Sequence, residues 1–140
     1  MRIMAIDYGD AHTGIAISDP TGFLAGFTTT IDAYRPEAVA ERVAALAREY
    51  GVEELVLGHP INMDGTRGPR AEKAQAMKHL LEETTSLPVI LWDERRTTID
   101  AHQILMGSGK NAKKRKKTVD AVAASLILEG YLDIKRMRRE

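Results

Sequence analysis

The chain alternates short apolar runs with longer amphipathic stretches, a pattern typical of a mixed α/β protein. The first apolar run, from Arg2 to Asp7, reaches a carboxylate and breaks at Gly9, and a second apolar run resumes at Gly14. We therefore expect a β-hairpin whose loop extends from Gly9 to Gly14. A third strand is predicted over Phe23–Thr30, where threonines and aromatic residues suit a pleated edge.

Two helix–strand units and a final helix follow these three strands. Pro36 opens a helix with apolar residues at helical spacing, and Gly51 ends it after Tyr50. The remaining predicted elements are a strand over Glu54–Leu57, a loop over His59–Gly65, a helix over Pro69–Thr84, a strand over Leu87–Trp92, a helix over Thr98–Met106 and a final helix capped by Thr118. This order predicts an α/β fold in which helices flank a mixed five-stranded sheet. The first three strands form a meander, and strands one, four and five are parallel.

Size and composition narrow the setting of the protein. A chain of 140 residues with 44% hydrophobic content suits one domain over residues 1–140. The sequence contains no cysteine, which excludes disulfides and thiolate metal sites. No run approaches the roughly 18 apolar residues that span a bilayer, and no export signal is indicated at the N-terminus. We expect a soluble, cytoplasmic protein without a membrane partner.

The net charge of zero conceals two oppositely charged regions. Residues 1–109 carry 10 Lys+Arg and 16 Asp+Glu, whereas residues 110–140 carry 10 Lys+Arg and 4 Asp+Glu. Six of the eight residues 110–117 are basic, and they follow Gly107-Ser108-Gly109 in what is predicted to be a flexible loop. A segregated positive patch favours a polyanionic partner such as nucleic acid, and a solvated loop and tail is the alternative.

Three acids stand at the ends of predicted elements. Asp7 ends the first strand, Asp93 and Glu94 follow the fifth strand, and Asp120 lies in the first turn of the final helix. Parallel strands end at the functional edge of such sheets, so these acids are candidate ligands for Mg²⁺ or Mn²⁺. Two ions about 4 Å apart would activate water and stabilise the leaving oxygen in phosphodiester cleavage.

Each acid also has a simpler interpretation. Asp7 suits a turn, and Asp120 suits the N-terminal end of a helix, where the macrodipole favours negative charge. Strand alternation prevents Asp93 and Glu94 from facing the same side, and we favour Glu94 as the metal-facing acid with Asp93 as a supporting residue.

Candidate nucleic-acid contacts are mostly cationic. Arg67 and Arg70 flank the start of a predicted helix, which is a natural anion site. Arg95 and Arg96 follow the acid pair and could hold a phosphate or neutralise the acids. The basic segment supplies five more candidates: Lys113, Lys114, Arg115, Lys116 and Lys117.

Histidine and asparagine supply the remaining candidates. His59 and Asn62 follow a strand end and could contact a phosphate or orient water, or have no role in the site. His12 shows no metal-ligand spacing with another histidine.

Several of these motifs together resemble one known family. They are Asp7-Tyr8-Gly9 with Gly14-Ile15-Ala16-Ile17-Ser18-Asp19, Gly58-His59-Pro60 with Asp64-Gly65, Asp93-Glu94-Arg95-Arg96-Thr97-Thr98, and Val119-Asp120-Ala121-Val122-Ala123-Ala124. In this order they look like the YqgF/RuvX family of Holliday-junction-resolvase-like pre-16S rRNA nucleases of bacteria. The resemblance implies an RNase H-like fold and a metal-dependent endonuclease that trims the 5′ end of the 16S rRNA precursor. It carries over Asp7, Glu94 and Asp120 as the catalytic acids.

The chain departs from that family in its first loop, where Ala11-His12 stand in place of the usual Lys-Arg. This departure removes two cations beside the first acid. The basic residues of segment 110–117 would compensate for this loss.

Three alternative functions remain open from the sequence. A nucleic-acid-binding factor without catalysis would need the basic segment but not the acids. A sugar-kinase or actin-like ATPase shares the Asp7-x-Gly9-x₄-Gly14 pattern, but such proteins close two domains around a nucleotide and this chain has room for one. A junction resolvase shares the nuclease chemistry on branched DNA and requires a dimer, whereas a monomer favours structured RNA as the partner.

Overall fold

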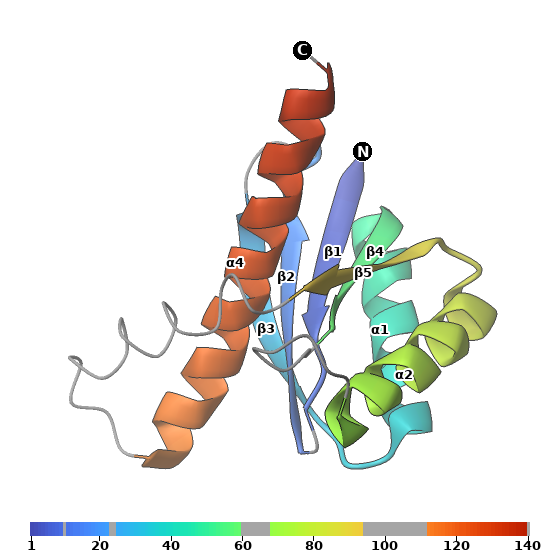
Figure 1. Ribbon diagram of the computed structural model, residues 1–140, viewed down its shortest axis with the longest axis vertical. Helices are drawn as coiled ribbons and strands as arrows, with labels where there is room; N and C mark the ends of the chain where they lie inside the picture. Colours follow the sequence, from blue (N-terminus) through green and yellow to red (C-terminus); the bar gives the residue numbers. More distant parts are fainter. Residues whose placement is uncertain (10, 23–24, 60–67, 94–111, 140) are drawn as a thin grey trace.

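A five-stranded mixed sheet forms the centre of the molecule (Figure 1). The computed structural model describes residues 1–9, 11–22, 25–59, 68–93 and 112–139, and it leaves the side chains at 25, 70, 112–121 and 136–139 undescribed. Its elements are β1 (Arg2–Asp7), β2 (His12–Ser18), β3 (Ala25–Asp32), α1 (Pro36–Tyr50), β4 (Val52–His59), α2 (Pro69–Thr85), β5 (Val89–Asp93) and α4 (Ala112–Arg139).

The strand order is β3-β2-β1-β4-β5. Strands β1, β2 and β3 form an antiparallel meander, and β4 pairs in parallel with both β1 and β5. The predicted fold class is therefore confirmed, including the parallel arrangement of the first, fourth and fifth strands.

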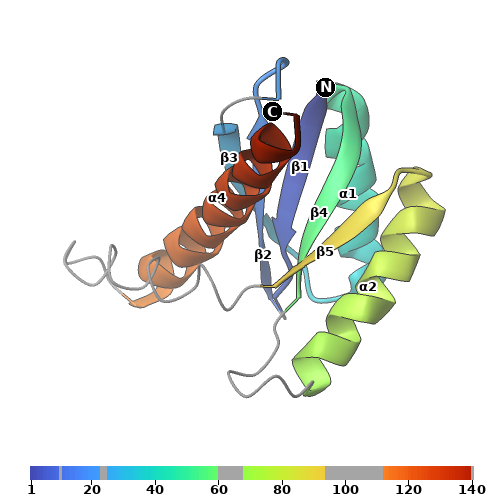
Figure 2. The same ribbon diagram turned by 45° about the horizontal axis from the view of Figure 1, so that its top comes forward.

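Helices cover both faces of the sheet, with α4 on one face and α1 and α2 on the other (Figure 2). The strand alternation of β1 explains the two layers. Met4 and Ile6 belong to the buried cluster under α1 and α2, whereas Ile3 and Ala5 belong to the cluster under α4. Because both faces are buried, the inner strands are almost continuously apolar.

Helix α1 follows its sequence signals at both ends. Pro36 occupies the first turn, and Gly51 ends the helix in the left-handed conformation with φ of 67°. The predicted helix from Pro36 to Tyr50 is confirmed, and α2 extends one residue beyond its predicted end at Thr84. Within the described ranges, no helix combines the length and apolarity needed to cross a bilayer.

The hairpin loop is shorter than predicted, because β2 begins at His12 and not at Gly14. The reason is pairing on its other edge, where the β2–β3 ladder continues to the pair His12–Asp32. Strand β3 accordingly extends to Asp32, two residues beyond its predicted end at Thr30. Residues 23–24, predicted to start this strand, lie outside the described residues.

Strand β4 is longer than predicted, because it hydrogen-bonds to neighbours on both sides. It covers Val52–His59, so His59 is a strand residue and not the first residue of a loop. Strand β5 begins at Val89 instead of Leu87 and continues to Asp93.

The final helix begins at Ala112, six residues before the predicted cap at Thr118. Lysine, arginine and alanine are good helix formers, and no glycine or proline interrupts residues 112–129, so the basic run continues the helix from residue 112. Asp120 is thus well inside α4. The macrodipole interpretation of Asp120 is therefore wrong, because that effect is confined to the first turn. The predicted helix over Thr98–Met106 lies outside the described residues.

Candidate functional site

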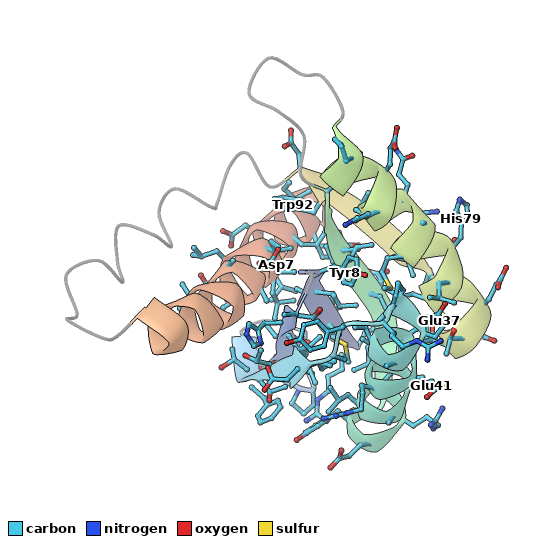
Figure 3. The ribbon with its side chains drawn as sticks, turned by 90° about the horizontal axis from the view of Figure 1, so that it is seen from below. Asp7, Tyr8, Glu37, Glu41, His79 and Trp92 are labelled. Atoms are coloured by element: carbon cyan, nitrogen blue, oxygen red, sulfur yellow. The ribbon has the colours of Figure 1, made fainter. Side chains whose placement is uncertain are left out.

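Asp7 stands at the carboxyl end of β1, on the side of the sheet that α4 covers. It pairs with Gly14 of β2. On β1 it lies two residues beyond Ala5, which belongs with Ile3 to the buried cluster under α4 (the α4 cluster), so Asp7 points to the same face. Figure 3 looks toward this end of β1 and shows Asp7 on the side of α4 and Tyr8 on the side of α1 and α2. The half-buried Asp7 carboxylate is therefore presented to the α4 layer.

The turn after Asp7 is tight and depends on glycine. A Cβ atom at Gly9 would collide with the carbonyl oxygen of His12, so a larger residue would force the backbone to move. The Gly9 amide donates to the hydroxyl of the buried Thr13, with the nitrogen and oxygen 3.5 Å apart. These contacts return the chain directly into β2 and keep the start of β2 close to the acid.

The end of β5 packs against α4 through Trp92. A Cβ atom on Gly130 would lie only 2.9 Å from Cζ2 of Trp92, so the absence of a side chain there allows the indole to approach the helix. The Trp92 and Tyr131 rings meet edge to face, with centroids 6.3 Å apart. The strand end that precedes residue 94 is thereby fixed against α4.

Asp93 faces the opposite side of the sheet. Val89 and Leu91, which share its parity on β5, pack against the cluster under α1 and α2. Its register partner on β4 is His59, which is 6% exposed. Asp93 and Asp7 therefore lie on different faces. The preference for Glu94 over Asp93 stays a prediction, because Glu94 lies outside the described residues.

Polar contacts fix α4 to the first half of β4. The Tyr131 hydroxyl donates to the Glu54 carboxylate, and Lys135 Nζ lies 3.3 Å from the same carboxylate oxygen. Glu54 is the register partner of Ile3 on β1. Helix α4 runs from the carboxyl end of β1 toward its amino end (Figure 1).

A pair that the sequence did not predict joins β2 and β3 at the same end of the sheet. His12 Nδ1 and Asp32 Oδ1 are 2.8 Å apart, with side chains that are 18% and 53% exposed. His12 shares the parity of Ala16, a member of the α4 cluster, so the pair lies on the face of Asp7. The two residues are distant in sequence, and only the β2–β3 register brings them together. Facing polar residues at adjacent strand ends were the available signal.

The remaining predicted site residues are only partly described. Glu94, Arg67, Arg95, Arg96 and Asn62 lie outside the described residues. Backbone positions alone are given for Arg70 in the first turn of α2, and within α4 for Lys113, Lys114, Arg115, Lys116, Lys117 and Asp120. The side chains that are described include no group of three His, Asp or Glu able to hold a metal ion, and two of the three predicted ligands are not among them.

The same arrangement of sheet and helices occurs in a solved nuclease structure. Thermus thermophilus RuvC in complex with a Holliday junction substrate superposes with a TM-score of 0.62 at 14% identity, covering 97% of this chain and 96% of that one. At this identity the likeness shows the fold alone. The chain has the RNase H-like fold of the RuvC-type nucleases.

Sequence comparison identifies the family. The family model described as "RuvX: Holliday junction resolvase" matches residues 1–134. A curated relative from Halothermothrix orenii is 45% identical over 133 residues, covering 95% of each chain, and one from Pelotomaculum thermopropionicum is 45% identical over 142 residues, covering 100% of this chain and 92% of the relative. Both carry the name "Putative pre-16S rRNA nuclease". The chain belongs to the RuvX family, which confirms the resemblance seen in its motifs.

Proposed function

We propose that residues 1–140 form one nuclease domain that hydrolyses phosphodiester bonds with divalent metal ions, and that its substrate is the 5′ region of the 16S rRNA precursor in the cytoplasm. The observation that carries the proposal is the position of Asp7, at the carboxyl end of β1 on the face covered by α4. The helix on that face also contains Asp120.

Helix and strand dimensions support a meeting of Asp7 and Asp120. Tyr131 bonds to Glu54, which is level with Ile3 on β1. Residue 120 precedes Tyr131 by about 16 Å along the helix axis at roughly 1.5 Å per residue. Asp7 follows Ile3 by about 13 Å along the strand at roughly 3.3 Å per residue. Because α4 runs opposite to β1, both acids fall at about the same level of the sheet.

Helical phase also favours Asp120 as a residue of this face. Position 120 precedes Ala124 by four residues and Ile127 by seven, and both of those residues are buried in the α4 cluster. Residues at this spacing share one side of a helix. The spacing therefore supports Asp120 as a residue of the stripe of α4 that faces the sheet.

Strand parity supports Glu94 as the third acid. Ile90 and Trp92 pack against the α4 cluster, and Glu94 continues their series two residues further along the chain. Asp93 has the opposite parity, and we propose it only as a supporting residue and not as a metal ligand.

The proposed ligands fit a hard divalent cation. Asp7, Glu94 and Asp120 offer only carboxylate oxygens, which are the donors that Mg²⁺ and Mn²⁺ prefer. When bound, a pair of such ions supplies an activated water and stabilises the leaving oxygen. The protein's proposed contribution is to supply the carboxylates from the end of β1, from the residue that follows β5 and from α4. The Trp92 and Tyr131 contacts hold α4 against β5 and β4.

The basic start of α4 provides the proposed docking surface for nucleic acid. Positions 113, 116 and 117 precede Asp120 by seven, four and three residues, so they share its side of the helix. The same surface is proposed to include Arg67 and Arg70 near the start of α2, and Arg95 and Arg96 after Glu94. Lys114 and Arg115 precede Asp120 by six and five residues, so they are proposed as more peripheral contacts. Cations at these places would contact the phosphate backbone and position it over the acids.

A cleavage assay on two substrates tests the proposal. A precursor rRNA fragment with its 5′ extension and a four-way DNA junction are incubated with the full chain, with Mg²⁺ or Mn²⁺ and with excess EDTA. We expect metal-dependent cleavage of the RNA, loss of cleavage in Asp7→Asn, and unchanged cleavage in Glu41→Gln, which alters an exposed acid on α1.

The outcomes separate the competing functions. Full activity in EDTA or in Asp7→Asn would overturn the metal-dependent mechanism. RNA binding without cleavage under any condition would support a non-catalytic binding factor. Cleavage of the junction in preference to RNA, by a dimer, would support the resolvase function that the family description names.

A further inference from the structure

We propose that the His12–Asp32 pair recognises a ribose 2′-hydroxyl next to the cleaved phosphodiester, and so makes this site selective for RNA over DNA. The inference rests on the proposed nuclease function, since it concerns the substrate of the same site. It requires that His12 lie within reach of the substrate, that its ring be fixed, and that its second ring nitrogen, Nε2, act as an acceptor.

The β-sheet register places His12 beside Asp7. Asp7 pairs with Gly14, and His12 is two residues from Gly14 on the same face of β2. Such diagonal neighbours in an antiparallel pair are about 7–8 Å apart, within reach of a long side chain. A nucleic acid whose phosphate is held at the metal site proposed at Asp7 would therefore have an adjoining sugar near His12.

Asp32 fixes the orientation and the tautomer of the histidine. Its Oδ1 lies 2.8 Å from His12 Nδ1, and an ionised carboxylate can only accept a hydrogen bond. The hydrogen of the neutral ring is therefore on Nδ1, which leaves Nε2 as a hydrogen-bond acceptor. The His12 side chain is 18% exposed, so part of it is open to a bound substrate.

An acceptor at this position selects a donor from the substrate backbone. Phosphate and ring oxygens of the backbone only accept, whereas the ribose 2′-hydroxyl can donate and is absent from DNA. The negative charge of Asp32 beside the ring also makes the pair a poor partner for a phosphate group. The chemistry of the pair therefore points to the 2′-hydroxyl.

The test uses RNA substrates that carry a single 2′-deoxy substitution at successive positions around the cleavage site. We expect His12→Ala to lower cleavage of the all-ribose substrate by about 3–10-fold, the value of one hydrogen bond. One deoxy position should lower cleavage by wild type to the same extent and have no further effect in His12→Ala. His79→Ala is the matched control, because His79 is an exposed histidine on α2 that also lies near a carboxylate, that of Glu82.

Two further variants keep the proposal falsifiable if His12→Ala is unstable. His12→Gln retains an acceptor oxygen and should recover part of the cleavage, whereas His12→Arg offers only donors and should not. Recovery by His12→Arg would overturn the inference in favour of a phosphate contact. Equal losses on the all-ribose and every deoxy substrate would also overturn it.

Failure of this inference can be distinguished from failure of the proposed function. If wild type cleaves the RNA with metal and the deoxy scan shows no position coupled to His12, only the hydroxyl recognition is wrong. If wild type cleaves no RNA under any metal condition, both proposals are overturned. Thermal unfolding of each variant, followed by circular dichroism, separates loss of folding from loss of contact.

Discussion

Gly130→Ala tests how closely α4 and the end of β5 pack together. The added Cβ would lie 2.9 Å from Cζ2 of Trp92, well inside the optimal carbon–carbon separation of about 3.5–4.0 Å. Trp92 cannot simply retreat, because its ring meets the Tyr131 ring edge to face within the α4 cluster. Either the indole or the helix must therefore move.

The expected change in stability is the difference between two opposing effects. Replacing a glycine in a helix interior by alanine stabilises by about 1 kcal/mol. Inserting a methyl group into a packed contact costs about 1–3 kcal/mol. We expect Gly130→Ala to lower the free energy of unfolding by at most about 2 kcal/mol, or roughly 4–8 °C in Tm.

Trp92 also provides the signal, since it is the only tryptophan in the chain. Gly130→Ala should shift its fluorescence emission, and Glu129→Ala, at an exposed neighbouring position, should not. In a double-mutant cycle, Gly130→Ala should lower the free energy of unfolding less in the Trp92→Phe background than in wild type. The coupling free energy between the two substitutions should be at least about 1 kcal/mol. RNA cleavage by Gly130→Ala should fall further than stability alone explains, because Trp92 is two residues from Glu94.

A single result would refute this reasoning. If Gly130→Ala raises stability by about 1 kcal/mol in both backgrounds and leaves Trp92 emission unchanged, only helix propensity is acting. Gly130 and Trp92 would then not be in close contact, and this contact could not position the acids.

Two further predictions concern the turn and the basic surface. Gly9→Ala should cost about 1–3 kcal/mol in urea unfolding and lower cleavage, because its methyl group would meet a backbone carbonyl at the start of β2. Lys113→Gln with Lys117→Gln should reduce the salt dependence of RNA binding, changing the log–log slope by about 1.4, whereas the equally charged change Lys114→Gln with Arg115→Gln should have a smaller effect. Equal slopes for the two pairs would show that the Asp120 side of α4 does not face the RNA.

The sequence predicted well those elements whose ends are set by residues within the element itself. Helix α1 matches its prediction at both ends, because Pro36 fixes the first turn and Gly51 takes the left-handed φ that ends the helix. The start of α4 was predicted six residues late, because a run of cations resembles a solvated loop in sequence. Lysine, arginine and alanine nevertheless favour the helix, and no glycine or proline interrupts residues 112–129.

The arrangement of the candidate site depends on strand pairing and on which face each helix covers, and neither can be read from a local stretch of sequence. Asp7 could be predicted as a site residue from its position at the end of a strand. The face that it occupies is known only once the residues that pack under α4 are known. The His12–Asp32 pair was not predicted, because it depends on the β2–β3 register across a separation of twenty residues. Strand ends were misjudged for the same reason, since pairing partners decide where a strand stops.

The two faces of the sheet differ in a way that connects packing with the proposed chemistry. Under α1 and α2 the cluster contains large side chains such as Met4 and Ile6, whereas Ala5 and Ala16 pair across β1 and β2 on the α4 side. A helix packed on methyl groups lies closer to the sheet than one packed on longer side chains. Ala124 completes this contact one turn after Asp120, so small side chains lie just where the proposed site requires α4 to approach Asp7. We therefore expect the size of these side chains, more than their hydrophobicity, to determine how near α4 comes to Asp7.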